Sequence, residues 1–181
     1  ASKVQDMPAP LIRSFDPIAR RDAKVLILGS MPGAASLAAG CYYAHPQNAF
    51  WRILGELLGF DAVAPYASRA RALRAARVAL WDVLQSCERP GSLDSRIVRD
   101  SMEPNDFAAL FARCRGIRRV CFNGAMAEAS FRRHVLPTLE AGAMEFVRLP
   151  STSPANASWS FERKLAAWRV VFETAGVAES G

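Results

Sequence analysis

The stretch from Val25 to Trp51 constrains the fold more than any other part of the chain. It begins with four apolar residues, VLIL, that run directly into Gly29-Ser30-Met31-Pro32-Gly33. An apolar run that stops at such a loop is typical of a buried parallel strand followed by the tight turn at its carboxyl end. Because open α/β sheets bind their ligands at that end, the stretch predicts both a fold class and the position of a site.

Strands and helices are predicted to alternate along the rest of the chain. We expect strands at residues 24–28, 78–81, 118–122 and 144–149. We expect a helical turn at 34–39, helices at 49–58, from 104 or 105 to 114, at 125–135 and at 161–172, a basic connection at 69–77 and a loop at 87–97. Such alternation implies right-handed crossovers. The predicted fold is therefore α/β, a three-layer α/β/α sandwich on a short, mainly parallel four-stranded sheet.

The length of 181 residues suits a single domain spanning 1–181, with an N-terminal arm over 1–21 that Leu11, Ile12 and Phe15 attach to the body. A hydrophobic fraction of 51% fits a compact globule. No apolar run approaches the ~20 residues needed to cross a bilayer, and the polar, proline-rich start is unlike a signal peptide. We expect a cytoplasmic monomer that makes no membrane contact.

The cysteine and histidine residues argue against a metal centre. None of the four cysteines, Cys41, Cys87, Cys114 and Cys121, is spaced as CxxC, and the two histidines, His45 and His134, lie far apart in the sequence. Zinc and iron-sulfur sites usually need closer spacing. We expect free, mostly buried thiols, no metal and no organic cofactor.

The charge balance favours an anionic partner. The chain has 23 Lys and Arg, mostly arginine, against 17 acidic residues, for a net charge of +6. Arginine suits bidentate contact with phosphate, so nucleic acid is one candidate. Ordinary surface solubility explains the same balance, and the series Arg69, Arg71, Arg74 and Arg77 fits a solvated face.

The carboxyl ends of parallel strands share one edge, so the loops at Gly29, Asp82, Asn123 and Ser151 should gather there. The run Ser151-Thr152-Ser153-Pro154 offers hydroxyls and backbone N–H groups that can hold a phosphate. Tyr42 and Tyr43 offer aromatic faces, and a stacked base is worth ~1–3 kcal/mol. The sequence thus predicts a groove for a nucleic-acid backbone beside a slot for one base.

Four segments, in order, carry a resemblance to a known family: GSMPG, YYAHPQNAFW, LWDVLQSCERPGSLDS and LPSTSPANA. Together they resemble the uracil-DNA glycosylase superfamily, most closely its hypoxanthine-DNA (deoxyinosine) glycosylase branch, over Lys24 to Phe172. The resemblance implies a monofunctional glycosylase of base excision repair. Such an enzyme hydrolyses the bond to a flipped deaminated base in damaged double-stranded DNA, leaving an abasic site. Single-stranded DNA stays open as a substrate, and mismatch-type uracil excision stays open as an alternative.

The sequence departs from the common pattern of that superfamily at three places. Met31 stands where most members carry an Asp or Asn that positions the attacking water, as in the hypoxanthine branch. Ser151 replaces the usual His or Asn of the second signature. The small Ala155 or the adjacent Asn156 takes the place of the residue that wedges into DNA. A weak wedge leaves more of the flipping cost to damaged or mispaired duplexes, where that cost is lower.

The reaction itself indicates which groups are needed. Cleavage of an N-glycosidic bond passes through an oxocarbenium-like state, as in glycoside hydrolysis, while negative charge develops on the base. The protein must supply donors to the base and a held water. We expect the Asn48 side-chain carbonyl, with a backbone carbonyl of Gly29 or Ser30, to hold that water.

The base is expected to stack on Tyr43, as the resemblance to mismatch-specific relatives implies, and to present its polar edge to the Gly29 loop and to Asp82 or Trp81. The predicted catalytic residues are Asn48 and Ser30. The predicted base-binding residues are Gly29, Met31, Pro32, Gly33, Tyr43, His45, Trp81 and Asp82. The predicted DNA-binding residues are Ser151, Thr152, Ser153, Ala155 and Asn156.

Each assignment has a purely structural alternative. Asn48 can be a helix N-cap, Asp82 can cap a turn, and His45 can fasten its loop. The tyrosines can be core rings with surface hydroxyls, the Ser-Thr-Ser run can be a helix-entry turn, and Trp159, Trp168 and Phe172 fit the core. Two other functional classes also stay open: an enzyme acting on a free nucleotide or another small phosphorylated molecule, and a lesion-binding protein without catalysis.

Overall fold

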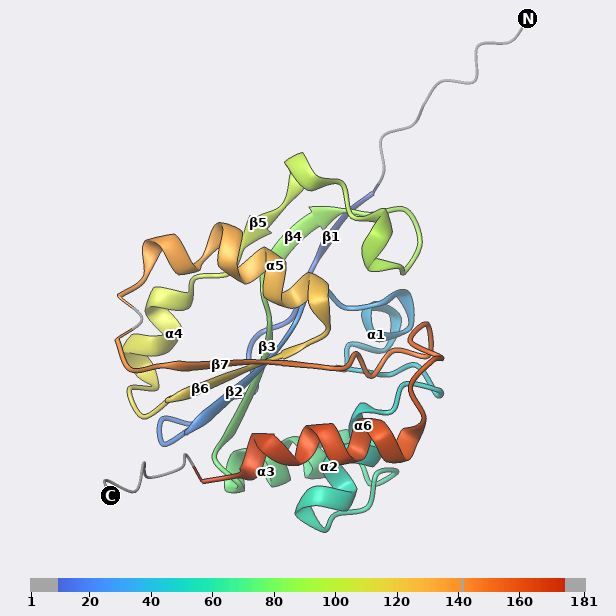
Figure 1. The fold of residues 1–181 in the computed structure, drawn as a ribbon. Coiled ribbons are helices and arrows are strands. Elements are labelled where there is room, and N and C mark those ends of the chain that lie inside the picture. Colours follow the sequence, from blue (N-terminus) through green and yellow to red (C-terminus); the bar gives the residue numbers. More distant parts are fainter. Residues whose placement is uncertain (1–9, 141, 175–181) are drawn as a thin grey trace, which may run out of the picture.

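The structure, a computed structural model, describes residues 10–140 and 142–174, so the first nine residues of the predicted arm lie outside it. Its centre is a parallel four-stranded sheet in the order β3-β2-β6-β7 (Figure 1). The strands are β2 (Val25–Gly29), β3 (Val78–Asp82), β6 (Arg119–Asn123) and β7 (Glu145–Leu149). The predicted sheet is confirmed, with strand ends shifted by one residue.

Helices cover both faces of this sheet, which confirms the three-layer sandwich (Figure 1). One face carries α4 (Phe107–Arg113) and α5 (Ala125–His134), and the other carries α2 (Phe50–Leu58), α3 (Tyr66–Ala75) and α6 (Phe161–Trp168). The short helix α1 (Ala34–Ala39) lies beyond the carboxyl ends of the strands. Short 3₁₀ turns cover Asp94–Arg96, Arg99–Ser101, Leu136–Thr138 and Arg169–Phe172.

Burial on both faces explains the sequence of β2. Leu26, Ile27 and Leu28 are completely buried because β2 lies between β3 and β6 and beneath both helix layers. Gly29 is the register partner of Asp82 across the β2–β3 pair. The two strands therefore end side by side, and their loops start from the same edge of the sheet.

A second, smaller sheet was not predicted. After Val83 the chain continues as β4 (Leu84–Glu88), which pairs antiparallel with β1 (Leu11–Arg13) and β5 (Glu103–Pro104). The expected loop over 87–97 is therefore wrong for its first two residues. Strands this short contain too few residues to show an alternating pattern. Ile12 pairs with Cys87 and the Phe15 ring packs on Tyr42, so these two residues attach the described part of the arm as expected, whereas the Leu11 side chain is 57% exposed and does not.

The predicted basic connection at 69–77 is mostly helix, α3. Arginine is a good helix former. The buried face consists only of Ala70 and Leu73, and the repeated arginines obscure this short apolar pattern in the sequence. Arg69 is not simply solvated, because its guanidinium lies 4.6 Å from the Trp51 ring centre and Nε donates to the Ala64 carbonyl at 2.8 Å.

The cysteine prediction is confirmed: all four thiols are free, and Cys87, Cys114 and Cys121 are buried. Trp168 is a core residue, completely buried, with Nε1 donating to the Pro150 carbonyl at 3.0 Å. None of the described helices combines the length and the apolar character that a membrane span requires.

Candidate active site

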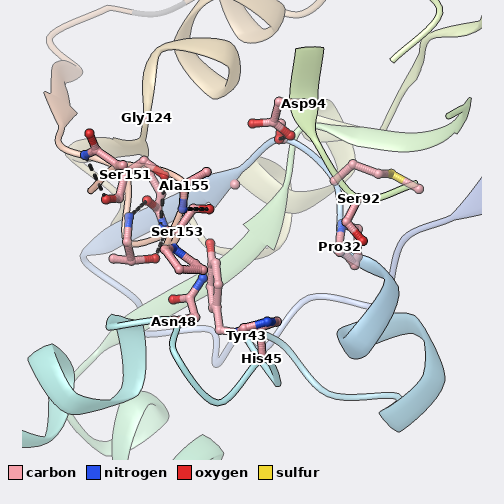
Figure 2. A pocket seen from close by; sticks show the side chains of 18 of the residues that line it. Pro32, Tyr43, His45, Asn48, Ser92, Asp94, Gly124, Ser151, Ser153 and Ala155 are labelled. Atoms are coloured by element: carbon pink, nitrogen blue, oxygen red, sulfur yellow. Dashed lines mark hydrogen bonds between the residues drawn. The ribbon is translucent and has the colours of Figure 1, made fainter. Parts of the chain in front are cut away.

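A cavity of about 950 Å³ opens at the carboxyl edge of the parallel sheet (Figure 2). Its walls come from segments far apart in the sequence, which are residues 29–36, 42–48, 92–95, 123–125 and 148–156, with Asp82 and Trp159. The prediction that the strand-end loops gather at one edge is thus confirmed for the loops at Gly29, Asp82, Asn123 and Ser151.

The loop after β2 is held from behind by the segment that follows β4. Arg89 is 2% exposed, and its Nη2 and Nε donate to the carbonyls of Pro32 and Gly91 at 2.6 and 2.9 Å. The Ala34 N–H donates to Ser92 Oγ at 2.9 Å. Sequence analysis did not single out these residues, although they lie within the ERPGSLDS segment. Contacts over more than fifty positions leave no local pattern.

Tyr43 forms one side of the slot expected for a base. Its backbone is left-handed, with φ 53°, a conformation that is uncommon outside glycine. One face of its ring stacks on Phe50, with ring centres 4.1 Å apart and planes at 26°. Tyr43 also lines the cavity. Its hydroxyl is buried without a hydrogen-bond partner, and burial raises the pKa of this hydroxyl, so it stays a neutral donor.

Asp82 lies at the floor of the cavity and is 3% exposed. Its Oδ2 is buried without a hydrogen-bond partner. Burial raises the pKa of the carboxyl to about 7, Asp94 adds to the rise, and Arg89 opposes it. A buried polar atom without a partner needs an explanation, and here the residue that carries it lines a cavity that can admit a ligand.

Asp94 provides a second carboxyl that lines the cavity. It lies on the wall opposite Ser151 (Figure 2). Ser30 Oγ donates to Asp94 Oδ1 at 2.6 Å. Desolvation raises the pKa of the Asp94 carboxyl, while the Ser30 hydrogen bond and Arg89 act against the rise. Asp94 could not be predicted as a site residue because its carboxyl comes from a segment 64 residues after Ser30. Met31 also lines the cavity, at 7% exposure.

Asn48 lines the cavity just before α2. Its Oδ1 accepts the Phe50 N–H at 3.0 Å, so the structural alternative, satisfying the start of a helix, is present. That bond also orients the amide, and a carbonyl oxygen keeps a second lone pair. The two backbone carbonyls expected to hold water already accept one bond each, Gly29 O from Val83 N at 2.8 Å and Ser30 O from Leu84 N at 3.1 Å.

His45 and Tyr42 lie outside the base slot, His45 at the exposed rim of the cavity and Tyr42 in the core. His45 is exposed at the rim, and its Nδ1 accepts the Gln47 N–H at 3.1 Å, which fastens its loop as the alternative predicted. Tyr42 is 3% exposed, and its hydroxyl donates to the Asp16 carbonyl at 2.9 Å. Of the two adjacent tyrosines, Tyr42 is the core ring.

The loop from Ser151 to Asn156 forms the other wall, where Ser151, Ser153 and Ala155 lie together (Figure 2). Ser151 Oγ accepts the Ser153 N–H, and Ser153 Oγ accepts the Ala155 N–H, both at 3.2 Å. The Asn156 amide donates to the Ser151 carbonyl at 3.1 Å. These bonds give the loop a fixed shape beside the cavity.

Two predicted site residues do not fit their roles. Thr152 is 1% exposed, and Asn123 binds both its N–H and its hydroxyl, so its polar groups hold the loop together instead of being free for DNA. Trp81 does not line the cavity. Its Nε1 donates to the Phe15 carbonyl at 2.9 Å and its ring packs on Phe107, so it does not bind the base. Trp159, expected in the core, instead lines the cavity.

The structure therefore brings most of the predicted set together. The cavity is lined by Gly29, Ser30, Met31, Pro32, Gly33, Tyr43, His45, Asn48, Asp82, Ser151, Thr152, Ser153, Ala155 and Asn156. Within residues 10–140 and 142–174, no group of three or more His, Cys, Asp or Glu is arranged to hold a metal ion.

Comparisons with known proteins point to one family. The family model of the Uracil DNA glycosylase superfamily matches residues 16–172. A protein of Methanosarcina acetivorans named Hypoxanthine DNA glycosylase is 35% identical over 161 residues, which are 88% of this chain and 97% of that protein. One of the same name from Methanosarcina barkeri is 33% identical over 162 residues, with 89% and 98% covered. A solution NMR structure of a Methanosarcina acetivorans protein matches with a TM-score of 0.73 and 32% identity, covering 91% of this chain and all of that one.

Proposed function

This chain belongs to the Uracil DNA glycosylase superfamily, and we propose that it is a monofunctional DNA glycosylase that removes hypoxanthine from deoxyinosine in DNA. The product is free hypoxanthine and an abasic site. The names of the two Methanosarcina relatives support this substrate. We further propose that the protein works as a cytoplasmic monomer on damaged double-stranded DNA.

The observation that carries the proposal is the pair of unsatisfied polar groups beside the Tyr43 ring. Tyr43 Oη and Asp82 Oδ2 are both buried without partners in a cavity-lining position. A flipped nucleobase is flat and has a polar edge, so it can stack on the open face of Tyr43 while its edge satisfies these groups. Hypoxanthine offers a ring N–H and a carbonyl side by side, which match one acceptor and one donor.

Asp82 supplies the donor when it is protonated, which its pKa of about 7 allows near neutral pH. A carboxylic acid in this position donates to the departing base and stabilises the negative charge that develops on it. The same group accepts the base N–H through its other oxygen. Asp82 is thus the base-recognition residue of the proposal, in place of Trp81.

Asn48 holds the attacking water in this scheme. The hydrogen bond from Phe50 N–H fixes the amide, and the second lone pair of Oδ1 accepts from the water. An amide is a poor base, so water attack follows substantial cleavage of the glycosidic bond. The carboxylate of Asp94, held by Ser30, adds negative charge to the cavity wall, which favours the cationic sugar.

The loop from Ser151 to Asn156 and the neighbouring Arg148 serve the DNA backbone. Arg148 lines the cavity, and its side chain is 59% exposed. Phosphate contacts position a duplex without selecting its sequence. This division of tasks, with backbone contacts at the rim and base contacts at the floor, suits an enzyme that searches DNA for one altered base.

A duplex oligonucleotide with a single deoxyinosine tests the proposal. It is incubated with the protein and then treated with alkali, which cleaves the strand at an abasic site. Strand scission supports a glycosylase, retention of the duplex without scission indicates a lesion-binding protein, and neither result favours the small-molecule enzyme. A parallel duplex carrying deoxyuridine separates hypoxanthine excision from mismatch-type uracil excision.

A further inference from the structure

Leu93 is a large apolar side chain exposed at the mouth of the cavity. It is 51% exposed and borders the cavity described above. It also borders a shallow depression formed with Pro90, Gly91, Ser92 and Arg96. Because Leu93 is exposed beside the cavity for the flipped base, it can contact the bases that remain stacked in the DNA on either side of it.

The residues on either side of Leu93 fix its position beside the cavity. Ser92 and Asp94, its two neighbours, are both tied to the loop after β2, through the Ala34 N–H at 2.9 Å and the Ser30 hydroxyl at 2.6 Å. Leu93 has an extended backbone, with φ −80° and ψ 135°. Both neighbours are bound to that loop while Leu93 itself is 51% exposed, so its side chain is accessible at a position that its neighbours fix.

The segment that carries Leu93 is fixed at both ends. Buried Arg89 donates to the Gly91 carbonyl at 2.9 Å, and the Val98 N–H donates to the Glu88 carbonyl at 2.9 Å. An apolar side chain on a restrained loop loses little further freedom when it is inserted into a partner. The restraint argues for a defined role at this position.

On the opposite wall Trp159 also lines the cavity, but its ring is only partly exposed and lies 4.2 Å from the Arg163 guanidinium. Ala155 ends in a methyl group, Asn156 uses its amide within its own loop, and Pro154 is short and rigid. In Figure 2, Ser92 and Asp94, which flank Leu93, lie across the cavity from Ser151, Ser153 and Ala155. Of the large hydrophobic residues that are exposed in the described part of the chain, Leu93 alone lines the cavity, and it comes from the segment after β4.

We propose that Leu93 enters the base stack of the duplex and occupies the space that the flipped nucleotide leaves, while Arg96 on the same segment contacts a nearby phosphate. Apolar side chains that insert between bases are a known way to hold a distorted duplex. Leu93 thereby takes the wedge role that sequence analysis gave to Ala155 or Asn156. This inference rests on the proposed function, since it needs a base to be flipped.

Leu93→Ala separates this role from catalysis. Single-turnover excision of deoxyinosine from a fully paired duplex should fall at least about ten-fold, because the flipped state loses its support. Excision from a single-stranded oligonucleotide should be unchanged, since no stack has to be opened there. Leu93→Met should keep the duplex activity. Val63→Ala, at a residue 87% exposed and outside the cavity, is the matched control.

A second measurement does not depend on turnover. With 2-aminopurine beside the deoxyinosine, binding of the wild-type protein should raise the fluorescence through unstacking, and Leu93→Ala should not. The proposal fails if Leu93→Ala matches Val63→Ala on the duplex, if duplex and single strand lose activity equally, or if Pro154→Ala alone shows the duplex-specific loss. If the wild type excises from neither substrate, the proposed function fails, and the fluorescence comparison still decides whether Leu93 is inserted.

Discussion

The hydroxyl of Tyr43 and the carboxyl of Asp82 converge beside Gly29. A Cβ atom at Gly29 would lie 2.9 Å from Tyr43 Oη and 2.5 Å from Asp82 Oδ1, which is closer than real Cβ atoms approach. Glycine at the end of β2 therefore leaves the room that two polar groups from different segments need. Tyr43 Oη and Asp82 Oδ2 both lack a hydrogen-bond partner, and both residues line the cavity.

Asp82 should make stability fall as pH rises. Its pKa of about 7 in the folded protein lies above the ordinary aspartate pKa of 3.8. Between these values the unfolded chain has released a proton that the folded chain keeps, so the free energy of unfolding decreases with rising pH up to about 7 and then stays low. Asp82→Asn should remove this decrease, which is worth about 4 kcal/mol at most.

Urea denaturation at mildly acidic and mildly alkaline pH measures the effect. Asp100→Asn, at an exposed carboxyl, should keep the wild-type pH dependence. The same pH dependence in Asp82→Asn and wild type would contradict the assignment. Excision by the wild type should also decline above neutral pH, because the donor form of Asp82 is lost.

Tyr43→Phe should reduce excision without reducing stability. The substitution keeps the stacked ring and removes a buried hydroxyl that has no partner. The free energy of unfolding should be unchanged or rise by about 1 kcal/mol. Tyr43→Leu should lose more activity, since a stacked base contributes ~1–3 kcal/mol. Single-turnover rates and urea denaturation test both variants, and full activity in Tyr43→Phe would exclude contact between the hydroxyl and the base.

Asn48→Ala should abolish most excision while DNA affinity stays nearly intact. The variant also loses the acceptor for the Phe50 N–H, which should lower the free energy of unfolding by about 1 kcal/mol. Asn48→Ser restores a side-chain acceptor near the helix start but not the amide, so it should recover stability and remain inactive. Recovery of activity in Asn48→Ser, or an unchanged single-turnover rate in Asn48→Ala, would show that Asn48 acts only at the start of α2.

Arg89→Lys should reduce both stability and excision. Lysine keeps the positive charge but lacks the planar guanidinium. A single ammonium group is unable to donate to the carbonyls of Pro32 and Gly91 at the same time. Loss of one such charge-assisted bond should cost about 1.5–3 kcal/mol. Thermal unfolding and single-turnover excision report the two effects. A variant that is destabilised but fully active would mean that the loop after β2 needs no support from Arg89.

DNA binding should weaken steeply with salt, because phosphate contacts release counterions. Arg148→Gln at the cavity wall should reduce the slope of log Kd against log salt concentration by about 1. Arg115→Gln, at the opposite end of the sheet just before β6, should leave the slope unchanged. Fluorescence anisotropy with a labelled duplex measures these slopes, and a binding constant indifferent to salt would contradict the phosphate contacts.

The parallel sheet could be predicted because β2, β3 and β6 are buried along almost their whole length. Residues 25–28 and 78–81 are continuous apolar runs, and such runs keep their meaning in any α/β sandwich. The strands β4 and β5 could not be predicted, since β4 (LQSCE) mixes polar and apolar residues without a continuous apolar run and β5 has only two residues. Because β4 was not predicted, the position of the segment that follows it, which brings Arg89 and Asp94 to the site, could not be predicted either.

The position at which β3 ends decides which residue lines the cavity. Trp81 and Asp82 are adjacent, and the sequence left open which of them reaches the cavity. Successive side chains of a strand face opposite sides, so a shift of one residue exchanges a core ring for a site carboxyl. In the structure Asp82 is the register partner of Gly29 and lines the cavity, while Trp81 packs on Phe107.

The most direct measurement is the release of free base from a duplex that contains one deoxyinosine, quantified by liquid chromatography and mass spectrometry. The wild-type protein should release hypoxanthine in an amount equal to the abasic sites formed, and Asn48→Ala should release far less from DNA that it still binds. Tight binding without free hypoxanthine, or release of a nucleoside or nucleotide in its place, would contradict hydrolysis of the glycosidic bond in this cavity.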